Sequence, residues 1–424
     1  MRITVNEDQR TLSRDGEPFF YLADTLWSAF TSIKEDDWLY YLRKRKEQGF
    51  NTVQINILPQ FDRSVSTKEI LPFEVDKNGR YNFEKINKEY FIRAEKLCRI
   101  ADKMGFSLSL VVLWSTYVEG TWVSKFTKDN IYPEHLLESY FELVLEHFDQ
   151  FNPIYFISGD TDFPTSKTIE IYMKTLRYFR QHSKQTLKAL HIIGRMDKLP
   201  EELALEVDLY LYQSGHNHDF LEMPYKLAET FFQYAPKKPV INSEPCYEQM
   251  GYSGHKYGRF NQTDVRRTAW QSILSGSTAG ITYGAHGVWS WETIGSTYLM
   301  NIGEAFDMPL LWQDALHFPG AWDYGYIKNL LEIYKVTSLE PANELLVDMA
   351  PDIRLAKSNQ GHYFIYLPKN TRIKVSIDMS TYTLKMIDLA NGRFVAPRVE
   401  FNDGETHFLH HSCEEDVLII SEPK

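Results

Sequence analysis

The chain of 424 residues is predicted to be an α/β protein, a (β/α)8 barrel of the TIM type followed by a small antiparallel β-sandwich. Strand-like apolar runs alternate with helix-like stretches through most of the chain, and short alternating segments replace them near its end. The length also exceeds the roughly 250–300 residues that one core usually accommodates. We therefore expect a barrel with a short N-terminal hairpin over residues 1–336 and a sandwich over residues 337–424.

Eight strand-like runs supply the predicted barrel. They are nearly continuous apolar stretches, such as residues 108–113, which is typical of parallel strands buried on both faces. An open doubly wound sheet is the competing fold, but residues 23–27 lack the glycine-rich phosphate turn expected after its first strand. The runs cover residues 19–27, 52–58, 107–114, 154–160, 187–194, 209–216, 239–244 and 279–287.

Apolar residues at spacings of three and four predict helices between these runs. The pattern is clearest in residues 91–104 and 136–148, and Gly49 and Gly105 follow two of the helices as stop signals. The predicted helices cover residues 35–48, 91–104, 136–148, 165–181, 219–233 and 264–274, with a looser helical region over 303–334.

Turn signals occur in both β-rich ends of the chain. Asp15-Gly16 predicts the turn of the N-terminal hairpin, and Asn391-Gly392 and Asp403-Gly404 predict turns in the sandwich. The predicted sandwich strands are residues 353–356, 362–367, 372–378, 382–388, 406–409 and 416–421.

Composition excludes several classes of partner. The net charge of −11 argues against nucleic acid and anionic membranes, and the basic residues 43–46 lie at helical spacing that predicts a solvated helix face. No run approaches the ~18 apolar residues of a membrane span. The three cysteines are widely spaced and odd in number, and the N-terminus lacks an apolar leader, so we expect a cytoplasmic protein without a disulfide framework.

In a parallel barrel the active site forms where the strands end, so the last residues of each run are the candidate site residues. These residues are mostly polar or aromatic. The tryptophans among them are candidate sugar-stacking walls, although a single tryptophan is more often a core residue. The two histidines either bond substrate hydroxyls or satisfy buried carbonyls. The candidate substrate-binding residues are Asp24, Trp27, Gln54, Asn56, Trp114, Gln213, His216, Tyr247, Tyr283, His286 and Trp289.

Two strand ends supply carboxyl groups that suit cleavage of an acetal. Such cleavage needs one carboxyl to protonate the leaving oxygen and another to attack the anomeric carbon or activate water. The fourth and seventh strands face each other, and a separation of about 5–5.5 Å would give a retaining enzyme. We assign Glu244 as the nucleophile and Asp160 as the acid/base. Asp162 is the alternative acid/base, with capping of the following helix as its favoured role.

Three further alternatives remain open from the residues alone. Asp24 either anchors a sugar hydroxyl or is a buried structural partner of Arg195. The barrel as a whole is either an enzyme or a carbohydrate-binding protein without activity. A metal-dependent hydrolase using His216, His218 and Asp24 is the third alternative, but His216 and His218 lack a nearby third ligand in sequence, so we expect neither metal nor cofactor.

Six motifs spread over nearly the whole chain share the pattern of one family; they are residues 23–27, 45–54, 159–160, 212–216, 242–248 and 279–289. Together they resemble the apiosidase-like glycoside hydrolases, retaining barrels described at first as a domain of unknown function, with a C-terminal sandwich labelled collagen-binding. The resemblance implies a catalytic Asp on the fourth strand, matching Asp160, and a catalytic Glu on the seventh, matching Glu244.

The resemblance also implies a substrate among plant cell-wall or related oligosaccharides. The family's usual pair of glycines before the fourth-strand Asp is replaced here by Ser158-Gly159. We therefore expect an exo-acting glycosidase for short plant-type oligosaccharides and do not extend release of apiose from pectin to this chain. Residues 337–424 contain no evident exposed ligand site, so we expect the sandwich to be a packing module.

Overall fold

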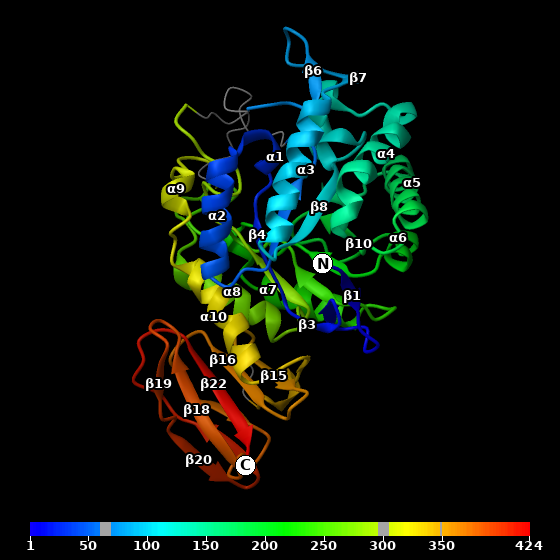
Figure 1. Ribbon diagram of the computed structural model, residues 1–424. Helices are drawn as coiled ribbons and strands as arrows, with labels where there is room; N and C mark the ends of the chain where they lie inside the picture. The colour runs from blue at the N-terminus through cyan, green and yellow to red at the C-terminus, as the bar shows by residue number, and fades with distance from the viewer. Residues whose placement is uncertain (60–68, 296–304, 348–349) are drawn as a thin grey trace.

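The computed structural model describes residues 1–59, 69–295, 305–347 and 350–424, and it contains two domains (Figure 1). The larger domain, blue to yellow in the figure, is an α/β barrel. The smaller domain, orange to red, is a pair of antiparallel sheets below the barrel. The predicted fold, a TIM-type barrel followed by an antiparallel β-structure, is confirmed.

Eight parallel strands form the barrel, and they coincide with the eight strand-like runs. Their order in the sheet is β10-β9-β8-β5-β4-β13-β12-β11. The strands are β4 (Tyr21–Thr25), β5 (Thr52–Asn56), β8 (Ser107–Trp114), β9 (Ile154–Thr161), β10 (Lys188–Ile192), β11 (Tyr210–Tyr212), β12 (Val240–Asn242) and β13 (Gly280–Tyr283).

The two end strands, β10 and β11, meet at a seam. The part of the chain that the structure describes has no continuous ladder between them. The backbone N–H of Asp208 donates to the carbonyl of Lys188 at 2.8 Å, and that of Arg195 donates to the carbonyl of Gln213 at 2.9 Å. These two bonds cross the seam, one near each of its ends, and close the barrel.

Helices cover the outside of the barrel and bury their apolar faces against it. In α3, the side chains of Phe91, Ala94 and Leu97 are buried, Asn87 caps the first turn, and Gly105 follows the helix with φ of +90°. The helices are α1 (Ala29–Ser32), α2 (Glu35–Glu47), α3 (Lys88–Lys103), α4 (Leu137–Phe148), α5 (Ser166–His182), α6 (Glu201–Glu206), α7 (Met223–Gln233), α8 (Gln262–Ile273), α9 (Trp312–Ala315) and α10 (Gly320–Ile333).

Several short elements differ from the prediction. Helix α6 and the hairpin of β6 (Phe73–Val75) and β7 (Tyr81–Ile86) are additional. The helix predicted from residue 219 begins at Met223, because residues 218–220 form a separate 3-10 turn. The helical region predicted from residue 303 starts outside the described residues, and its described part contains α9 and α10.

The predicted solvated face of residues 43–46 is wrong for one residue. Arg43 and Lys46 are exposed, but Arg45 is fully buried. Its Nε donates to Asp24 Oδ2 at 2.5 Å, and this buried ion pair joins α2 to β4. Among the described residues, no helix has the length and apolar composition that crossing a bilayer requires.

The two β-rich ends of the chain use the predicted turns. Asp15-Gly16 joins the second and third strands of an N-terminal sheet, which consists of β1 (Ile3–Val5), β2 (Leu12–Arg14) and β3 (Glu17–Phe19). The sandwich pairs a sheet of order β14-β15-β16-β22-β18-β19 with one of order β17-β21-β20. Its strands are β14 (Leu339–Pro341), β15 (Arg354–Ser358), β16 (Tyr363–Leu367), β17 (Ile373–Val375), β18 (Tyr382–Asp388), β19 (Arg393–Val395), β20 (Val399–Asn402), β21 (Glu405–Phe408) and β22 (Val417–Pro423).

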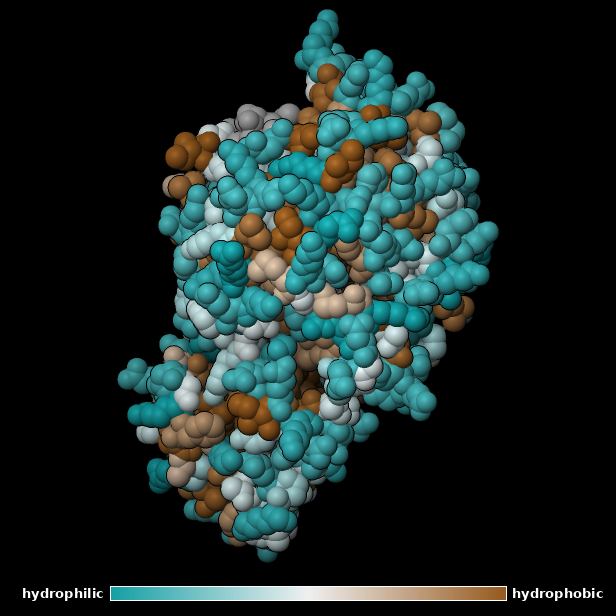
Figure 2. Space-filling view, in the orientation of Figure 1, coloured by the Kyte–Doolittle hydropathy of each residue, from teal (hydrophilic) through white to brown (hydrophobic). Residues whose placement is uncertain are grey.

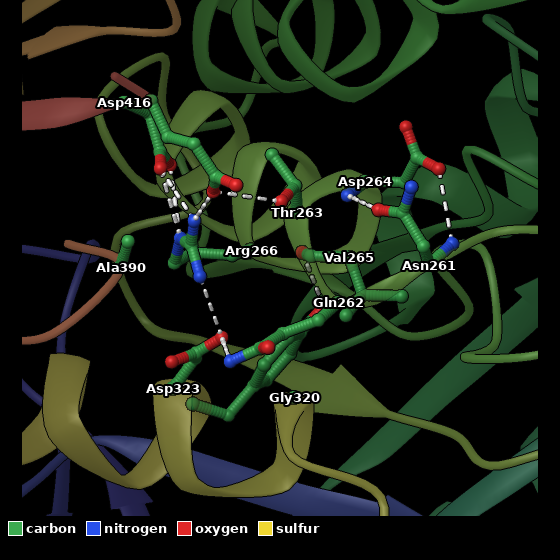
Figure 3. A network of polar contacts seen from close by, with 12 residues as sticks. Asn261, Gln262, Thr263, Asp264, Val265, Arg266, Gly320, Asp323, Ala390 and Asp416 are labelled. Atoms are coloured by element: carbon green, nitrogen blue, oxygen red, sulfur yellow. Dashed lines mark hydrogen bonds and ion pairs between the residues drawn. The ribbon is translucent and has the colours of Figure 1, made fainter.

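A charged network joins the sandwich to the barrel (Figure 3). Arg266 of α8 contacts Asp416 beside β22 at 2.5 Å, Glu415 at 3.0 Å and Asp323 of α10 at 3.1 Å. The hydroxyl of Tyr366 also donates to Asp416, which is fully buried. The face shown in Figure 2 is mainly hydrophilic, with hydrophobic residues visible in the notch between the two domains. The domains are therefore joined by buried charge as well as apolar packing.

Candidate active site

A cavity of about 280 Å³ opens at the carboxyl ends of the barrel strands. Its position agrees with the general location of active sites in such barrels. It is lined by residues that follow seven different strands, with apolar surface predominating. Among the predicted site residues, those in the lining are Trp27, Trp114, Asp160, Gln213, His216, Glu244, Tyr247 and Trp289.

Glu244 lies two residues beyond β12, in a segment fixed by backbone bonds. The carbonyl of Glu244 accepts the Gly215 N–H at 3.1 Å, and the Ser243 N–H donates to Tyr212 O at 2.9 Å. Gln54 supports the same segment from the barrel interior, because its Nε2 donates to Ser243 O at 3.0 Å. The segment therefore holds the carboxylate at the rim with only 7% of the residue exposed.

Two histidine rings face the Glu244 carboxylate. His216 Nε2 lies 2.9 Å from Oε1, and His191 Nε2 lies 3.2 Å from Oε2. The His191 contact is bent and falls short of regular hydrogen-bond geometry. Burial by itself raises the pKa of Glu244, but the two histidines outweigh burial and lower that pKa to about 2. Glu244 is therefore an ionised carboxylate at neutral pH.

Asp160 is the penultimate residue of β9 and has a strained conformation beside the same cavity. Its φ is +48°, in the left-handed region that is unfavourable for a residue with a Cβ. Its N–H donates to His191 Nδ1 at 3.1 Å, and its carbonyl accepts the Trp122 indole N–H at 2.8 Å. Both backbone groups of Asp160 are thus held by side chains of the site.

The preceding residue, Gly159, allows a ring to pack against β9. A Cβ at this position would lie 2.2 Å from Cε3 of Trp114 and 2.9 Å from Cγ1 of Val111. Gly284 has the same role on the opposite side, where a Cβ would lie 2.0 Å from Cδ1 of Tyr247. These two glycines let aromatic rings reach the cavity wall.

Asp162 is outside the cavity lining. Its Oδ1 accepts the Trp122 backbone N–H at 3.2 Å. The predicted capping of the following helix is wrong, because the N-cap of α5 is Thr165, whose side chain accepts the Thr168 N–H. Asp162 therefore fixes the loop after β8 to the turn after β9.

The aromatic wall is a connected set of rings. Trp27 Nε1 donates to the Tyr247 hydroxyl at 3.1 Å, and the rings of Trp27 and Trp114 meet edge to face at 5.2 Å. Burial, and then the charge of Glu244, raise the pKa of the Tyr247 phenol, so Tyr247 stays neutral. Within the described part of the chain, Trp114 Nε1 and Gln213 Oε1 are buried without a hydrogen-bond partner. They offer one donor and one acceptor to a polar ligand in this wall.

Five predicted binding residues lie behind the wall or outside the lining. Asp24 is paired with Arg45, and not with Arg195, and also accepts from Tyr41 at 2.7 Å. Tyr283 donates to Glu248 at 2.6 Å, and His286 Nδ1 accepts the Trp289 indole N–H at 3.2 Å. Gln54 and Asn56 are buried among the strands.

His191 and Trp122 are the site residues that the sequence reasoning missed. His191 interrupts the apolar run of residues 189–192, and that interruption is a signal for an inward-facing polar group. Trp122 lies in the loop after β8, where no periodic pattern places it near Asp160. Arg195, at the start of the loop after β10, lines the cavity with φ of +68° and stacks on Phe220.

The three residues considered as metal ligands, His216, His218 and Asp24, each contact a different partner. The His218 ring packs on Tyr252 with 4.3 Å between centroids, whereas His216 contacts Glu244 and Asp24 contacts Arg45. Over residues 1–59, 69–295, 305–347 and 350–424, no three His, Cys, Asp or Glu side chains are arranged to hold a metal ion.

Solved structures with a similar fold are glycoside hydrolases. One, described as a glycoside hydrolase, is 21% identical with a TM-score of 0.81 and covers 100% of this chain and 97% of its own. A family 5 glycoside hydrolase from Bacteroides vulgatus is 22% identical with a TM-score of 0.80 and covers 99% and 94%. A search of curated proteins finds no match.

The match to a glycosidase family over residues 6–338 makes the protein a glycosidase, and its barrel with a carboxylate-bearing cavity at the rim agrees with that class. The family profile described as apiosidase-like, catalytic domain, matches residues 6–338. The chain belongs to the apiosidase-like family, and the resemblance indicated by its motifs is confirmed.

Proposed function

We propose that the protein is a retaining, exo-acting glycosidase of short plant-type oligosaccharides, with Glu244 as nucleophile and Asp160 as general acid/base. The observation that carries this proposal is the state of Glu244. A carboxylate buried in the cavity wall, with a pKa lowered to about 2 by two histidines, suits attack on an anomeric carbon and does not suit proton donation.

Four further findings support the proposal. Asp160 lines the same cavity, whereas Asp162 is bound to the Trp122 backbone outside the lining. The free donor of Trp114 and acceptor of Gln213 match the hydroxyl groups of a sugar. The cavity is small and walled by aromatic rings, which favours a terminal sugar over a long chain. Membership of the family supports plant-type oligosaccharides as the substrate class.

The test begins with a screen of aryl glycosides and plant-derived oligosaccharides, with product anomers followed by NMR. We expect hydrolysis with retention of configuration. Asp160→Asn should lower kcat/KM by about 10²- to 10⁴-fold, the usual contribution of an acid/base group, and Glu244→Gln by at least as much.

Asp162→Asn is the matched control, because it changes a carboxyl two residues away that does not line the cavity. It should retain far more activity than Asp160→Asn. Azide should rescue an Asp160→Ala variant by attacking the covalent intermediate. Full activity in Glu244→Gln would contradict the assignment, and sugar binding without hydrolysis would favour a binding protein.

A further inference from the structure

His191 has polar contacts to both proposed catalytic residues. It lies on β10, and its residue is fully buried. Nδ1 accepts the Asp160 N–H at 3.1 Å, while Nε2 faces Glu244 Oε2 at 3.2 Å. One imidazole therefore connects the end of β9 to the segment after β12, across the seam between β10 and β11.

These contacts determine the position of the ring's proton. The backbone N–H of Asp160 is a donor only, so His191 Nδ1 must be unprotonated to accept from it. The single proton of the neutral ring is then on Nε2, facing Glu244. His216 has the same orientation, because its Nδ1 lies 3.4 Å from the Tyr247 N–H that it accepts.

The surrounding rings prevent His191 from turning. Trp114 lies nearly parallel to it at 5.7 Å, Phe156 at 6.2 Å, and Trp27 meets it edge to face at 5.4 Å. A proton added to Nδ1 would therefore point at the Asp160 N–H, and two donors would face each other. The bond that holds Asp160 in its left-handed conformation would be lost.

The charged and titratable groups near His191 are few. Glu244 faces it from the segment after β12, and His216 lies on the other oxygen of Glu244. Asp160 adjoins it from β9, and Arg195 lines the same cavity four residues further along the chain. The rings that pack against it are uncharged: Trp27 from the segment after β4, Trp114 from β8 and Phe156 from β9.

We propose that His191 is a positioning residue that aligns Asp160 and Glu244 only while its ring is neutral, so that protonation of His191 switches the site off in acid. This proposal rests on the proposed function. Glu244 itself stays ionised well below the range in which histidines titrate, since its pKa is lowered to about 2.

Two amide variants of His191 test the contacts of its two ring nitrogens separately. His191→Asn places an oxygen near the former Nδ1 and keeps an acceptor for Asp160, whereas His191→Gln places its amide near the former Nε2, facing Glu244. Each should lower kcat/KM at pH 7 by about ten- to a hundredfold, because each loses one polar contact to the site. Neither side chain titrates.

The pH profile of kcat/KM is the decisive measurement. The wild type should fall about tenfold per pH unit on its acid side, and both amide variants should lack this limb. His216→Gln should be less active but keep the limb, and His182→Gln, on the exposed end of α5, should match the wild type. An unchanged acid limb in His191→Asn and His191→Gln would overturn the proposal.

A spectroscopic measurement on the wild type covers the case in which the variants fail to fold. In ¹⁵N-histidine-labelled protein, long-range ¹H–¹⁵N spectra should show His191 at neutral pH with a bare Nδ1 and a protonated Nε2. A protonated Nδ1 at neutral pH would overturn the proposal without any activity measurement. If instead Glu244→Gln were fully active while His191 had the expected tautomer, the proposed function would fail and the coupling geometry would stand.

Discussion

At the scale of single residues, the site depends on glycines, whose lack of a side chain leaves room for neighbouring rings. Trp114 occupies the space that a Cβ on Gly159 would need, and Gly159 directly precedes Asp160. The Trp114 ring, which forms part of the cavity wall, therefore packs directly on the backbone that positions Asp160.

We expect Gly159→Ala to destabilise the protein by about 1–3 kcal/mol through overpacking, and to lower activity by displacing Asp160. Urea unfolding and kcat/KM measure the two effects. Gly194→Ala is the control for stability, because a Cβ there would meet Gln213 at an ordinary 3.7 Å. Equal unfolding free energies for the two variants would contradict the packing argument.

The sequence predicts which residues reach the rim better than it predicts which way they face. The strand-end rule brings Trp27, Trp114 and Glu244 to the cavity, because parallel strands end at one face of the barrel. It also selects Asp24, which points to Arg45 of α2, since that orientation depends on a partner distant in sequence. His191 was missed because it lies inside a strand and not at its end.

At the scale of elements, Glu248 links three parts of the barrel. It follows β12, accepts the Tyr283 hydroxyl at 2.6 Å from the end of β13, and accepts the Gly320 N–H at 2.9 Å at the start of α10. Burial raises its pKa from 4.5 to about 7, against the opposing effect of these bonds.

The folded protein thus holds the Glu248 proton more tightly than the unfolded chain does, and stability falls as pH rises from about 4.5 to 7. We expect this group to cost about 3 kcal/mol of unfolding free energy by pH 8. Glu248→Gln should lack that part of the pH dependence in chemical denaturation, and Glu47→Gln on exposed α2 should keep it. A Glu248→Gln variant as pH-dependent as the wild type would contradict the raised pKa.

The elements that the sequence predicts are those with their own hydrophobic signal. All eight barrel strands and helices such as α3 and α5 have long apolar runs or periodic faces. Helix α6 has six residues, and the sandwich strands β14, β19 and β20 have three or four. Such short segments are determined by contacts with neighbours, which a local pattern does not contain.

At the scale of the whole molecule, Arg266 is the centre of the charged network that joins the sandwich to the barrel. Its guanidinium, 3% exposed, contacts Asp416, Glu415 and Asp323, and Asp416 is fully buried. Removing one partner from a buried charge network leaves the others unpaired, which usually costs about 3–5 kcal/mol.

We expect Arg266→Met to lower stability by this amount, and to separate the unfolding of sandwich and barrel in calorimetry. Limited proteolysis should then cut between residues 333 and 339, the connection from α10 to β14. Arg267→Met is the control, because within the described part of the chain the ion pair of Arg267 is with Asp264 of the same helix. A single transition at the wild-type temperature in Arg266→Met would show that apolar packing alone holds the domains together.

The seam between β10 and β11 has a consequence for the motions of the barrel. Glu244 follows β12, on one side of the seam, and His191 belongs to β10, on the other, so their contact crosses the gap in the ladder. Amide hydrogens beside the seam should exchange with solvent faster than those of the continuous ladders. The Glu244 carboxylate would then also link the two sides of this seam, and substrate that engages Glu244 would alter exchange at Arg195, in the same cavity, and at Asp208, at the other end of the seam.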